Sequence, residues 1–249
     1  MTKTLLDSYI KKFSLGKIIS KAKMKYTALA GTLHTRATCD NLSFMSDVVL
    51  KDFKEFGDTD QIICVGDTEK LRAIISPFTD EIKMSLNISG DRVLGMNFND
   101  TDVETYFGSS DPVAIPPSPK NITGLDNPDV IISMTEEFVK QFLKAKVALD
   151  ETASFAVAMN KKGLVEFVFG YLTFNSNKIR ITPKTDSVKN KLSKGLLFPV
   201  VNLAEVLRAN SDMIDGGKME IFESGLIKLS FSNDQFEANY YQFSNQQKL

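Results

Sequence analysis

The chain has 249 residues, enough for one large domain or two of ordinary size. Hydrophobic residues make up 43% and charged residues 24%, a balance typical of globular proteins with a buried core. The net charge of −1 excludes a strongly basic protein, although a neutral total still allows a basic face opposite an acidic one. Cys39 and Cys64 are the only cysteines, so we expect no disulfide scaffold and a cytoplasmic location. With no signal-peptide core and no run of 18 apolar residues, we also expect no membrane span.

The first half begins with the pattern of an amphipathic helix over residues 4–13 and continues as strands. One side of this helix is apolar and the other polar, with Leu6, Tyr9, Ile10 and Phe13 opposite Asp7, Ser8, Lys11 and Lys12. Residues 17–65 alternate in short runs between turn residues, which predicts strands and hairpins. Asp67 fits the N-cap of a short helix over residues 68–75, and strands resume over residues 82–107.

Residues 111–129 have the composition of a linker. They hold five of the eight prolines in the chain, at positions 112, 116, 117, 119 and 128. Because proline fixes φ and removes an N–H donor, this stretch excludes a central strand or a helix interior. Proline-dense chain is extended and fairly stiff, so we expect a connector between two domains.

The second half begins with a helix that resembles the first one. Thr135 fits its N-cap, and Glu136 and Glu137 lie in the first turn, where the helix dipole favours carboxylates. An apolar arc and a basic one lie on opposite sides of this helix, with Phe138, Val139, Phe142 and Leu143 on the first and Lys140 and Lys144 on the second.

The rest of the second half again predicts strands and one short helix. Strand-like runs cover residues 155–159, 164–174 and 178–182. Asn202 fits the N-cap of a helix over residues 203–209, and two last strands flank the turn at Ser224 and Gly225. The order helix, strands, helix, strands therefore occurs twice, which predicts an α+β fold with a high strand content.

The two halves are also weak copies of each other in sequence. Four segments recur in the same order, 129 to 136 residues apart: residues 9–13 at 138–142, 71–73 at 207–209, 83–86 at 218–221, and 93–98 at 226–231. A period this long indicates a duplicated domain and not a solenoid repeat. We therefore predict one domain over residues 1–111, a connector over 112–131 and a second domain over 132–249, a layout common in symmetric assemblies.

This layout resembles a PCNA-type sliding clamp, in the two-domain form carried by tailed phages. Three features carry the resemblance over essentially the whole chain: the two similar domains, the proline-rich segment that opens with Ser110, Asp111 and Pro112, and the ending FEANYY at residues 236–241, which is similar to the final strand of phage clamps. The connector is longer than expected for those clamps. The resemblance implies that three copies close into a ring of six domains. Helices line the central hole, sheets form the outside, and the ring encircles duplex DNA.

The resemblance makes the basic helix faces candidates for contact with DNA. A sliding ring needs cations that face phosphates without reading bases. The candidates are Lys11, Lys12, Arg72, Lys140, Lys144 and Arg208 on the helices, and Lys189 and Lys191 in a loop. The alternative interpretation is that these are ordinary solvated helix faces and a mobile basic loop. The recurrence of Lys11 at Lys140 and of Arg72 at Arg208 favours the DNA interface.

The resemblance also implies partner proteins and where they dock. In such clamps a short peptide binds an apolar pocket beneath the connector, near the last strand. By position, the pocket residues are Leu42, Phe44, Met45, Ile115, Ile122, Tyr241 and Phe243, although most apolar strand residues belong to the core. The implied partners are DNA polymerase, the ATP-driven clamp loader, and for some phage clamps the transcription machinery. Neighbouring copies join through edge strands, here near residues 104–108 and 177–182.

The sequence gives no sign of enzymatic chemistry or of a bound cofactor. His34 is the single histidine, between Leu33 and Thr35 in an ordinary strand pattern, so we expect a structural role for it. HExxH, GxGxxG and GxxxxGK[ST] motifs do not occur, and the acidic pairs have no companion metal ligands. We therefore expect no enzyme, no metal and no cofactor. The alternatives to a closed clamp are a clamp-like processivity factor that forms no ring and a viral structural protein built from duplicated domains.

Overall fold

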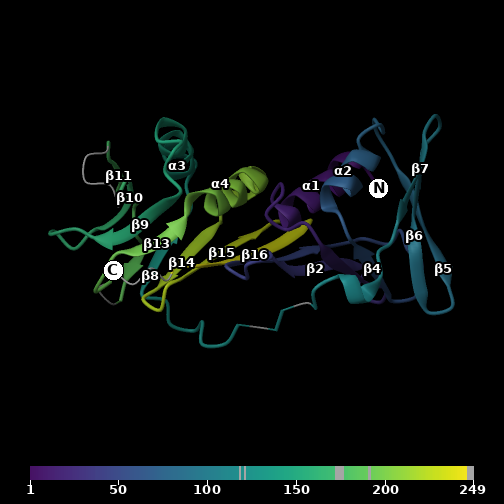
Figure 1. Ribbon diagram of the computed structural model, residues 1–249, viewed down its shortest axis with the longest axis horizontal. Coiled ribbons are helices and arrows are strands. Elements are labelled where there is room, and N and C mark those ends of the chain that lie inside the picture. The colour runs from purple at the N-terminus through teal and green to yellow at the C-terminus, as the bar shows by residue number, and fades with distance from the viewer. Residues whose placement is uncertain (118, 121, 172–176, 190–191, 246–249) are drawn as a thin grey trace. The chain divides into compact units, whose positions relative to one another are not determined.

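The contacts within the chain divide it into two compact units. The computed structural model describes residues 1–117, 119–120, 122–171, 177–189 and 192–245 (Figure 1). The first unit is Met1–Lys120 with Asn233–Ala238, and the second is Asn121–Ser232 with Asn239–Leu249. The division after Lys120 lies within the proline-rich connector, and a short segment near the end of the chain belongs to the first unit.

Two helices of the first unit, α1 (Lys3–Ser14) and α2 (Thr68–Ile75), lie side by side (Figure 1). Helix α1 starts and ends one residue beyond the predicted range, and the Thr2 side chain accepts a hydrogen bond from Leu5 N at 3.2 Å. Helix α2 has the predicted bounds, because Asp67 caps it by accepting a hydrogen bond from Lys70 N at 2.9 Å. Local capping thus fixes where both helices begin.

The strands of the first unit form two antiparallel groups. Strands β1 (Ala22–Thr27), β2 (Thr32–Thr38), β3 (Phe44–Leu50) and β4 (Gln61–Val65) are adjacent in the order β3-β2-β1-β4. Strands β5 (Lys83–Ser89), β6 (Arg92–Asn99) and β7 (Glu104–Gly108) form a second sheet in the order β5-β6-β7. Helix α1 packs on β2 and β3, where the Tyr9 hydroxyl lies 2.6 Å from Thr35 Oγ1 and Ser46 Oγ donates to the Phe13 carbonyl.

The late segment Asn233–Ala238 makes specific contacts inside the first unit. Lys51 N donates to the Gln235 carbonyl at 2.8 Å, and Lys51 Nζ forms an ion pair with Glu237 at 3.0 Å. The ring of Phe236 lies 5.0 Å from Lys12 Nζ on α1. Residues more than 180 positions apart in the sequence therefore complete one core.

The connector region has little regular structure among its described residues. A short 3-10 helix, η1 (Pro112–Ala114), begins after Asp111, whose side chain accepts a hydrogen bond from Val113 N at 2.9 Å. From Ile115 to Asp129, the described residues lie in no helix or strand, as the prolines predict. Strand β8 (Val130–Ser133) follows directly.

The second unit repeats this plan with two helices, α3 (Glu136–Ala148) and α4 (Val200–Ala209). Strands β9 (Ser154–Met159), β10 (Val165–Phe169), β11 (Ile179–Ile181) and β13 (Leu196–Pro199) form a sheet in the order β11-β10-β9-β13. Strands β12 (Ser187–Val188), β8, β14 (Lys218–Phe222), β15 (Leu226–Ser232) and β16 (Phe236–Phe243) are adjacent in the order β12-β8-β14-β15-β16, and β16 belongs to the second unit from Asn239 onward. The prediction of an α+β fold with two helices in each of two similar parts is confirmed.

Aromatic side chains fill the core beneath α3. Phe142, on the predicted apolar arc, is fully buried and meets Phe155 at 5.2 Å and Phe169 at 5.1 Å between ring centroids. Phe155 stacks on Phe167 at 5.6 Å, and Phe138 meets Phe167 edge-on. Such ring pairs add to the stabilisation that burial of the rings already gives. The rigid core fixes which face of α3 stays outside.

Two sequence predictions in the second unit need correction. Helix α4 begins at Val200 after Pro199, so Asn202 lies inside the first turn and is not its N-cap. The reason is long-range, because β13 runs straight into the helix and Val200 N donates to the Ala153 carbonyl at 3.0 Å. The strand predicted over residues 164–174 ends at Phe169, before Gly170 with φ +71° in the left-handed region; residues 172–176 lie outside the described part.

Candidate nucleic-acid interface

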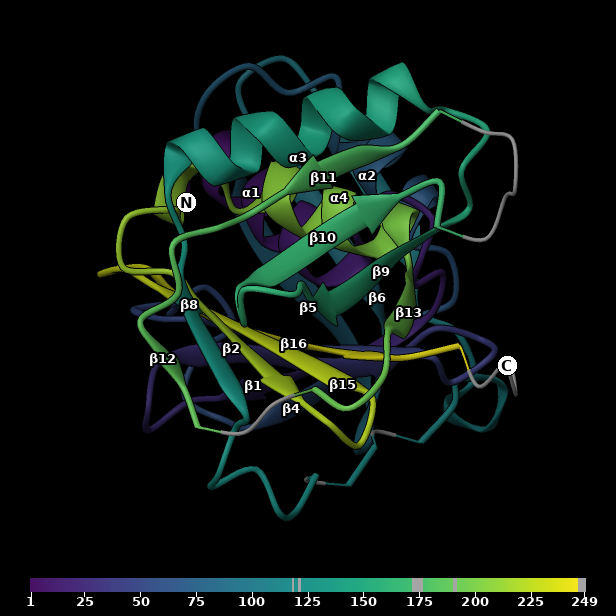
Figure 2. The ribbon, with the colours of Figure 1, turned by 90° about the vertical axis from the view of Figure 1, so that its left-hand side faces the viewer.

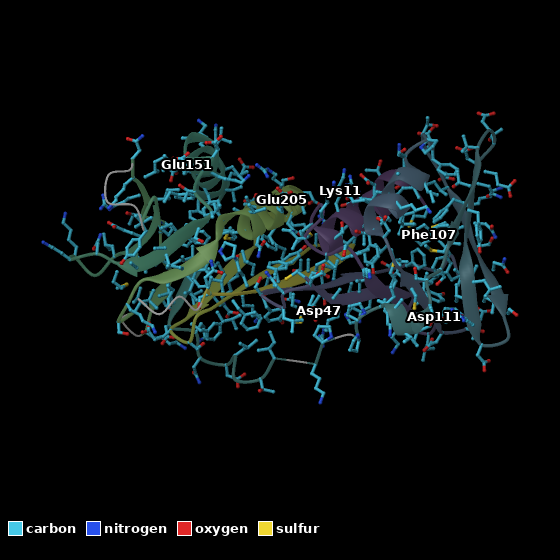
Figure 3. The ribbon with its side chains drawn as sticks, viewed as in Figure 1. Lys11, Asp47, Phe107, Asp111, Glu151 and Glu205 are labelled. Atoms are coloured by element: carbon cyan, nitrogen blue, oxygen red, sulfur yellow. The ribbon has the colours of Figure 1, made fainter. Side chains whose placement is uncertain are left out.

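Two of the three predicted cations of the first unit meet at one carboxylate. Lys11 is exposed on α1 (Figure 3). Its Nζ lies 2.5 Å from Asp7 Oδ2, one turn earlier on the same helix. Arg72 on α2 reaches the other oxygen of Asp7 with its Nε at 3.2 Å, and its Nη1 lies 3.4 Å from Glu69. Lys11 and Arg72 are therefore both paired with carboxylates of these two helices.

The cations also hold Asp7 in its charged form. Burial alone would raise the pKa of this carboxyl, but the hydrogen bonds and charges of Lys11 and Arg72 outweigh burial and bring its pKa below the ordinary value. Asp7 is thus a carboxylate at neutral pH, and it remains paired with both cations.

Lys12 does not lie where the helical wheel predicts. Its side chain is fully buried, with Nζ over the face of the Phe236 ring, so the prediction of an exposed, DNA-facing Lys12 is wrong. The error has a physical reason, because Phe236 comes from the far end of the sequence and covers a side of α1 that the local pattern marks as polar. A buried ammonium over an aromatic face is a cation–π contact.

The second unit presents its cations differently. Lys140 and Lys144 are exposed one turn apart on α3, and within the described part of the chain neither has a carboxylate at ion-pair distance. Arg208 on α4 forms an ion pair with Glu205 of the same helix, and Figure 3 labels Glu205 on α4. Lys189 is exposed after β12, whereas Lys191 lies outside the described residues.

Beside these lysines α3 carries a groove that the sequence analysis did not predict. It has a volume of about 630 Å³ and a mainly apolar surface. The apolar lining residues are Val139, Leu143, Val147, Ala148 and Ile214, and the polar ones are Glu136, Lys140, Lys144 and Ser211. Val147 is 71% exposed. Val139, Leu143 and Val147 follow each other at intervals of four, so they share a face of the helix, and this spacing was the available signal.

The predicted pocket residues fall into two groups. In the first unit Leu42 is 68% exposed, but Phe44, Met45 and Ile115 are buried. Phe44 and Met45 belong to the core of β3, which corrects the expectation that they form a peptide-binding surface. In the second unit Ile122 and Tyr241 are half-buried and Phe243 is 37% exposed.

The predicted edge strands each lie at the end of a sheet. Strand β7 is the last strand of the order β5-β6-β7, and β11 is the last of the order β11-β10-β9-β13. Helix α3 lies beside β11, as Figure 2 also shows. A terminal strand leaves one row of backbone N–H and C=O groups without a partner from its own sheet, which invites pairing with another strand.

The comparisons with known proteins decide what these two units resemble. No protein-family model matches the sequence, and no curated protein matches it significantly. The structure, in contrast, is similar to PCNA of A. fulgidus, solved with the C-terminal region of FEN-1 bound, with a TM-score of 0.73 and 18% identity over 100% of this chain and 98% of that one. The chain has the PCNA fold.

Two further structures give the same result. PCNA from Entamoeba histolytica has a TM-score of 0.71 at 11% identity, covering 98% of this chain and 96% of that chain. The PCNA2–PCNA3 complex from Sulfolobus tokodaii has a TM-score of 0.70 at 12% identity, covering 99% and 98%. The similarity to PCNA clamps is confirmed at the level of the fold, while the closer resemblance to phage clamps stays a prediction.

His34 has a structural role, because it links two neighbouring strands of the first unit. It lies on β2 as predicted, and its Nε2 is 2.6 Å from Asp47 Oδ1 on β3. Arg36 Nε donates to the other oxygen of Asp47 at 2.8 Å. Among the described residues, no three His, Cys, Asp or Glu side chains form a group that would hold a metal ion. In the same residues no helix combines the length and the apolar character needed to cross a bilayer.

Proposed function

We propose that this chain is a sliding clamp, a DNA polymerase processivity factor. Three copies form a closed ring around duplex DNA and tether the replicative polymerase, after an ATP-dependent loader has placed the ring. The observation that carries the proposal is the PCNA fold, which extends over the whole chain in two similar units. The protein acts as a scaffold, so the polymerase and the loader perform the chemistry.

The exposed cations suit a ring that slides. Lys140, Lys144, Arg208 and Lys189 are exposed, and Lys11 is exposed although it is paired with Asp7. Contacts to phosphates give an attraction that does not depend on sequence, because base edges are not read. The ring itself keeps the protein on DNA, so these contacts need only to be weak enough for movement along the duplex.

The two terminal strands supply a way to close the ring. In this proposal β7 of one copy pairs with β11 of the next, and three such pairings return to the first copy. Such a contact joins two different surfaces of neighbouring copies, and it forms a closed ring only when the rotation from one copy to the next returns to the first copy. Otherwise it forms an open filament.

Partner proteins are proposed to dock through short peptides near the connector. Leu42 and Phe243 are the exposed members of the predicted pocket set. The A. fulgidus PCNA structure holds the C-terminal region of FEN-1, which is a precedent for this fold binding a terminal peptide segment. The polymerase, the loader and, for a phage clamp, the transcription machinery are the partners that we propose.

The first test is the solution mass, measured by light scattering over a range of concentrations. Three chains of 27.7 kDa weigh about 83 kDa, so we expect that mass for the closed ring. A companion assay measures the length of DNA made by the cognate polymerase with and without the protein and loader. A persistent monomer that still stimulates the polymerase would favour a non-ring processivity factor. A large polymer without stimulation would favour a structural protein.

A further inference from the structure

The two helix pairs carry cations at equivalent positions, but these cations differ in how they pair with carboxylates. In the first unit Asp7 forms ion pairs with Lys11 at 2.5 Å and with Arg72 at 3.2 Å, and Glu69 forms a second ion pair with Arg72. Two carboxylates therefore balance two cations on this face. Asp7 is also partly buried, so its pairs are less screened by solvent than a fully exposed ion pair.

The corresponding place in the second unit lacks this arrangement. Residue 136 lies 129 positions after residue 7, as Lys140 does after Lys11, so Glu136 is the counterpart of Asp7. Yet Lys140 and Lys144 have no carboxylate at ion-pair distance among the described residues, and Arg208 pairs with Glu205 on its own helix. Nothing comparable to the Asp7–Arg72 bridge links α3 to α4 in the described part.

We propose that the phosphates of the duplex are held mainly by Lys140 and Lys144 of the second unit, and that Asp7 withholds Lys11 and Arg72 from DNA. This inference rests on the proposed function and assigns unequal roles to its two basic helix pairs. A cation already neutralised by a protein carboxylate gains little from a phosphate, and it releases few counterions from DNA. Asp7 is thus a residue that tunes DNA affinity without touching DNA.

Unequal helix pairs would lower the total number of phosphate contacts in each chain. Each contact adds affinity, but it must also break and re-form when the ring moves along the duplex. Pairing Lys11 and Arg72 with Asp7 keeps the helix packing and the side-chain positions while it removes their attraction for DNA. The arrangement therefore favours sliding over tight binding.

The test measures binding of the full chain to a short mixed-sequence duplex by fluorescence anisotropy at several salt concentrations. The readout is the slope of log affinity against log salt, which changes by roughly 0.9 for each phosphate contact. Lys140→Gln with Lys144→Gln should flatten the slope by at least one contact. Lys11→Gln with Arg72→Gln should leave it nearly unchanged, because the paired cations do not contribute.

Asp7→Asn gives the sharper result, since the inference predicts a gain. Removing this charge frees Lys11, whereas Arg72 keeps Glu69 as a partner, so affinity should rise and the slope should steepen by roughly 0.9 for the released lysine. Asp91→Asn is the matched control, because it makes the same charge change in the exposed turn between β5 and β6. Thermal unfolding and light scattering of each variant establish that the fold and the assembly persist.

The outcomes separate this inference from the proposed function. If the Lys11 and Arg72 substitutions flatten the slope as much as the Lys140 and Lys144 substitutions do, the inference is wrong although the clamp proposal stands. The same holds if Asp7→Asn binds no more tightly than Asp91→Asn. If the unsubstituted chain shows no salt-dependent binding to the duplex and no stimulation of a polymerase, the clamp proposal fails and the inference fails with it.

Discussion

Asp47 is one of two buried carboxylates among the described residues, and its environment keeps it charged. His34 and Arg36 on β2 each contact one of its oxygens. Burial would raise the pKa of Asp47, but the hydrogen bonds from His34 and Arg36 outweigh burial, so its pKa is lowered. The single histidine of the chain thus works as a cross-strand partner in the sheet.

We predict that Asp47→Asn destabilises the fold in a pH-dependent way. Because the folded pKa of Asp47 lies below the unfolded value, its stabilisation is present above about pH 4 and is lost as pH falls through the folded pKa. The variant should therefore lose about 1–3 kcal/mol in the free energy of unfolding at pH 7, and less at pH 3. Urea unfolding of both proteins at the two pH values measures this. An equal loss at both would mean that packing, and not charge, is responsible.

At the scale of the element, the two helices of the second unit begin by different means. Thr135 Oγ1 accepts a hydrogen bond from Phe138 N at 3.2 Å and caps α3. Helix α4 has no side-chain cap, and it is aligned by β13 and by the hydrogen bond from Gln242 Nε2 to the Pro199 carbonyl at 2.7 Å. Local sequence therefore sets the start of α3, and tertiary contacts set the start of α4.

This difference predicts unequal effects of alanine at the two candidate caps. Thr135→Ala should lower the free energy of unfolding by about 1 kcal/mol, because the first turn of α3 loses an acceptor for its N–H groups. Asn202→Ala should change it by less than about 0.5 kcal/mol, as expected for a site without a special contact. Chemical denaturation measures both values. A larger loss for Asn202→Ala than for Thr135→Ala would restore Asn202 as a capping residue.

At the scale of the whole molecule, the free edge of β7 is the part that ring closure needs. Ser109 N donates to the Leu94 carbonyl on β6, so by strand alternation the N–H of Tyr106 points away from β6. Proline at position 106 removes no hydrogen bond to β6, but it blocks an added strand. The Tyr106 hydroxyl also donates to the Leu94 carbonyl at 3.0 Å, and any substitution that lacks it loses this bond.

We therefore predict that Tyr106→Pro abolishes the trimer while Tyr106→Phe keeps it. Both variants lose the hydroxyl, but only proline removes the outward N–H, so the comparison isolates strand pairing. Light scattering gives the mass of each, and circular dichroism verifies that the strands of the monomer remain. A trimeric Tyr106→Pro variant would exclude β7 from the contact between copies.

Sequence reasoning succeeded where structure depends on neighbours in the chain. The bounds of α2, the caps Asp67 and Thr135, and the buried arc around Phe142 follow from local pattern and capping chemistry. It failed where distant segments meet. Lys12 is covered by Phe236, and the groove on α3 includes Ile214, which follows α4. The pairing of Arg72 with Asp7 joins two helices and has no signal in either helix alone.

The segment Asn233–Ala238 belongs to the first unit although it follows most of the second unit in the sequence, so the first unit is complete only when the whole chain is present. Lys51 and Lys12 both depend on residues from this late segment, so residues 1–120 alone lack part of their own core. A protease that cuts the connector would leave a second fragment that still carries a segment of the first unit. One cut in the connector therefore does not divide the chain into two complete units.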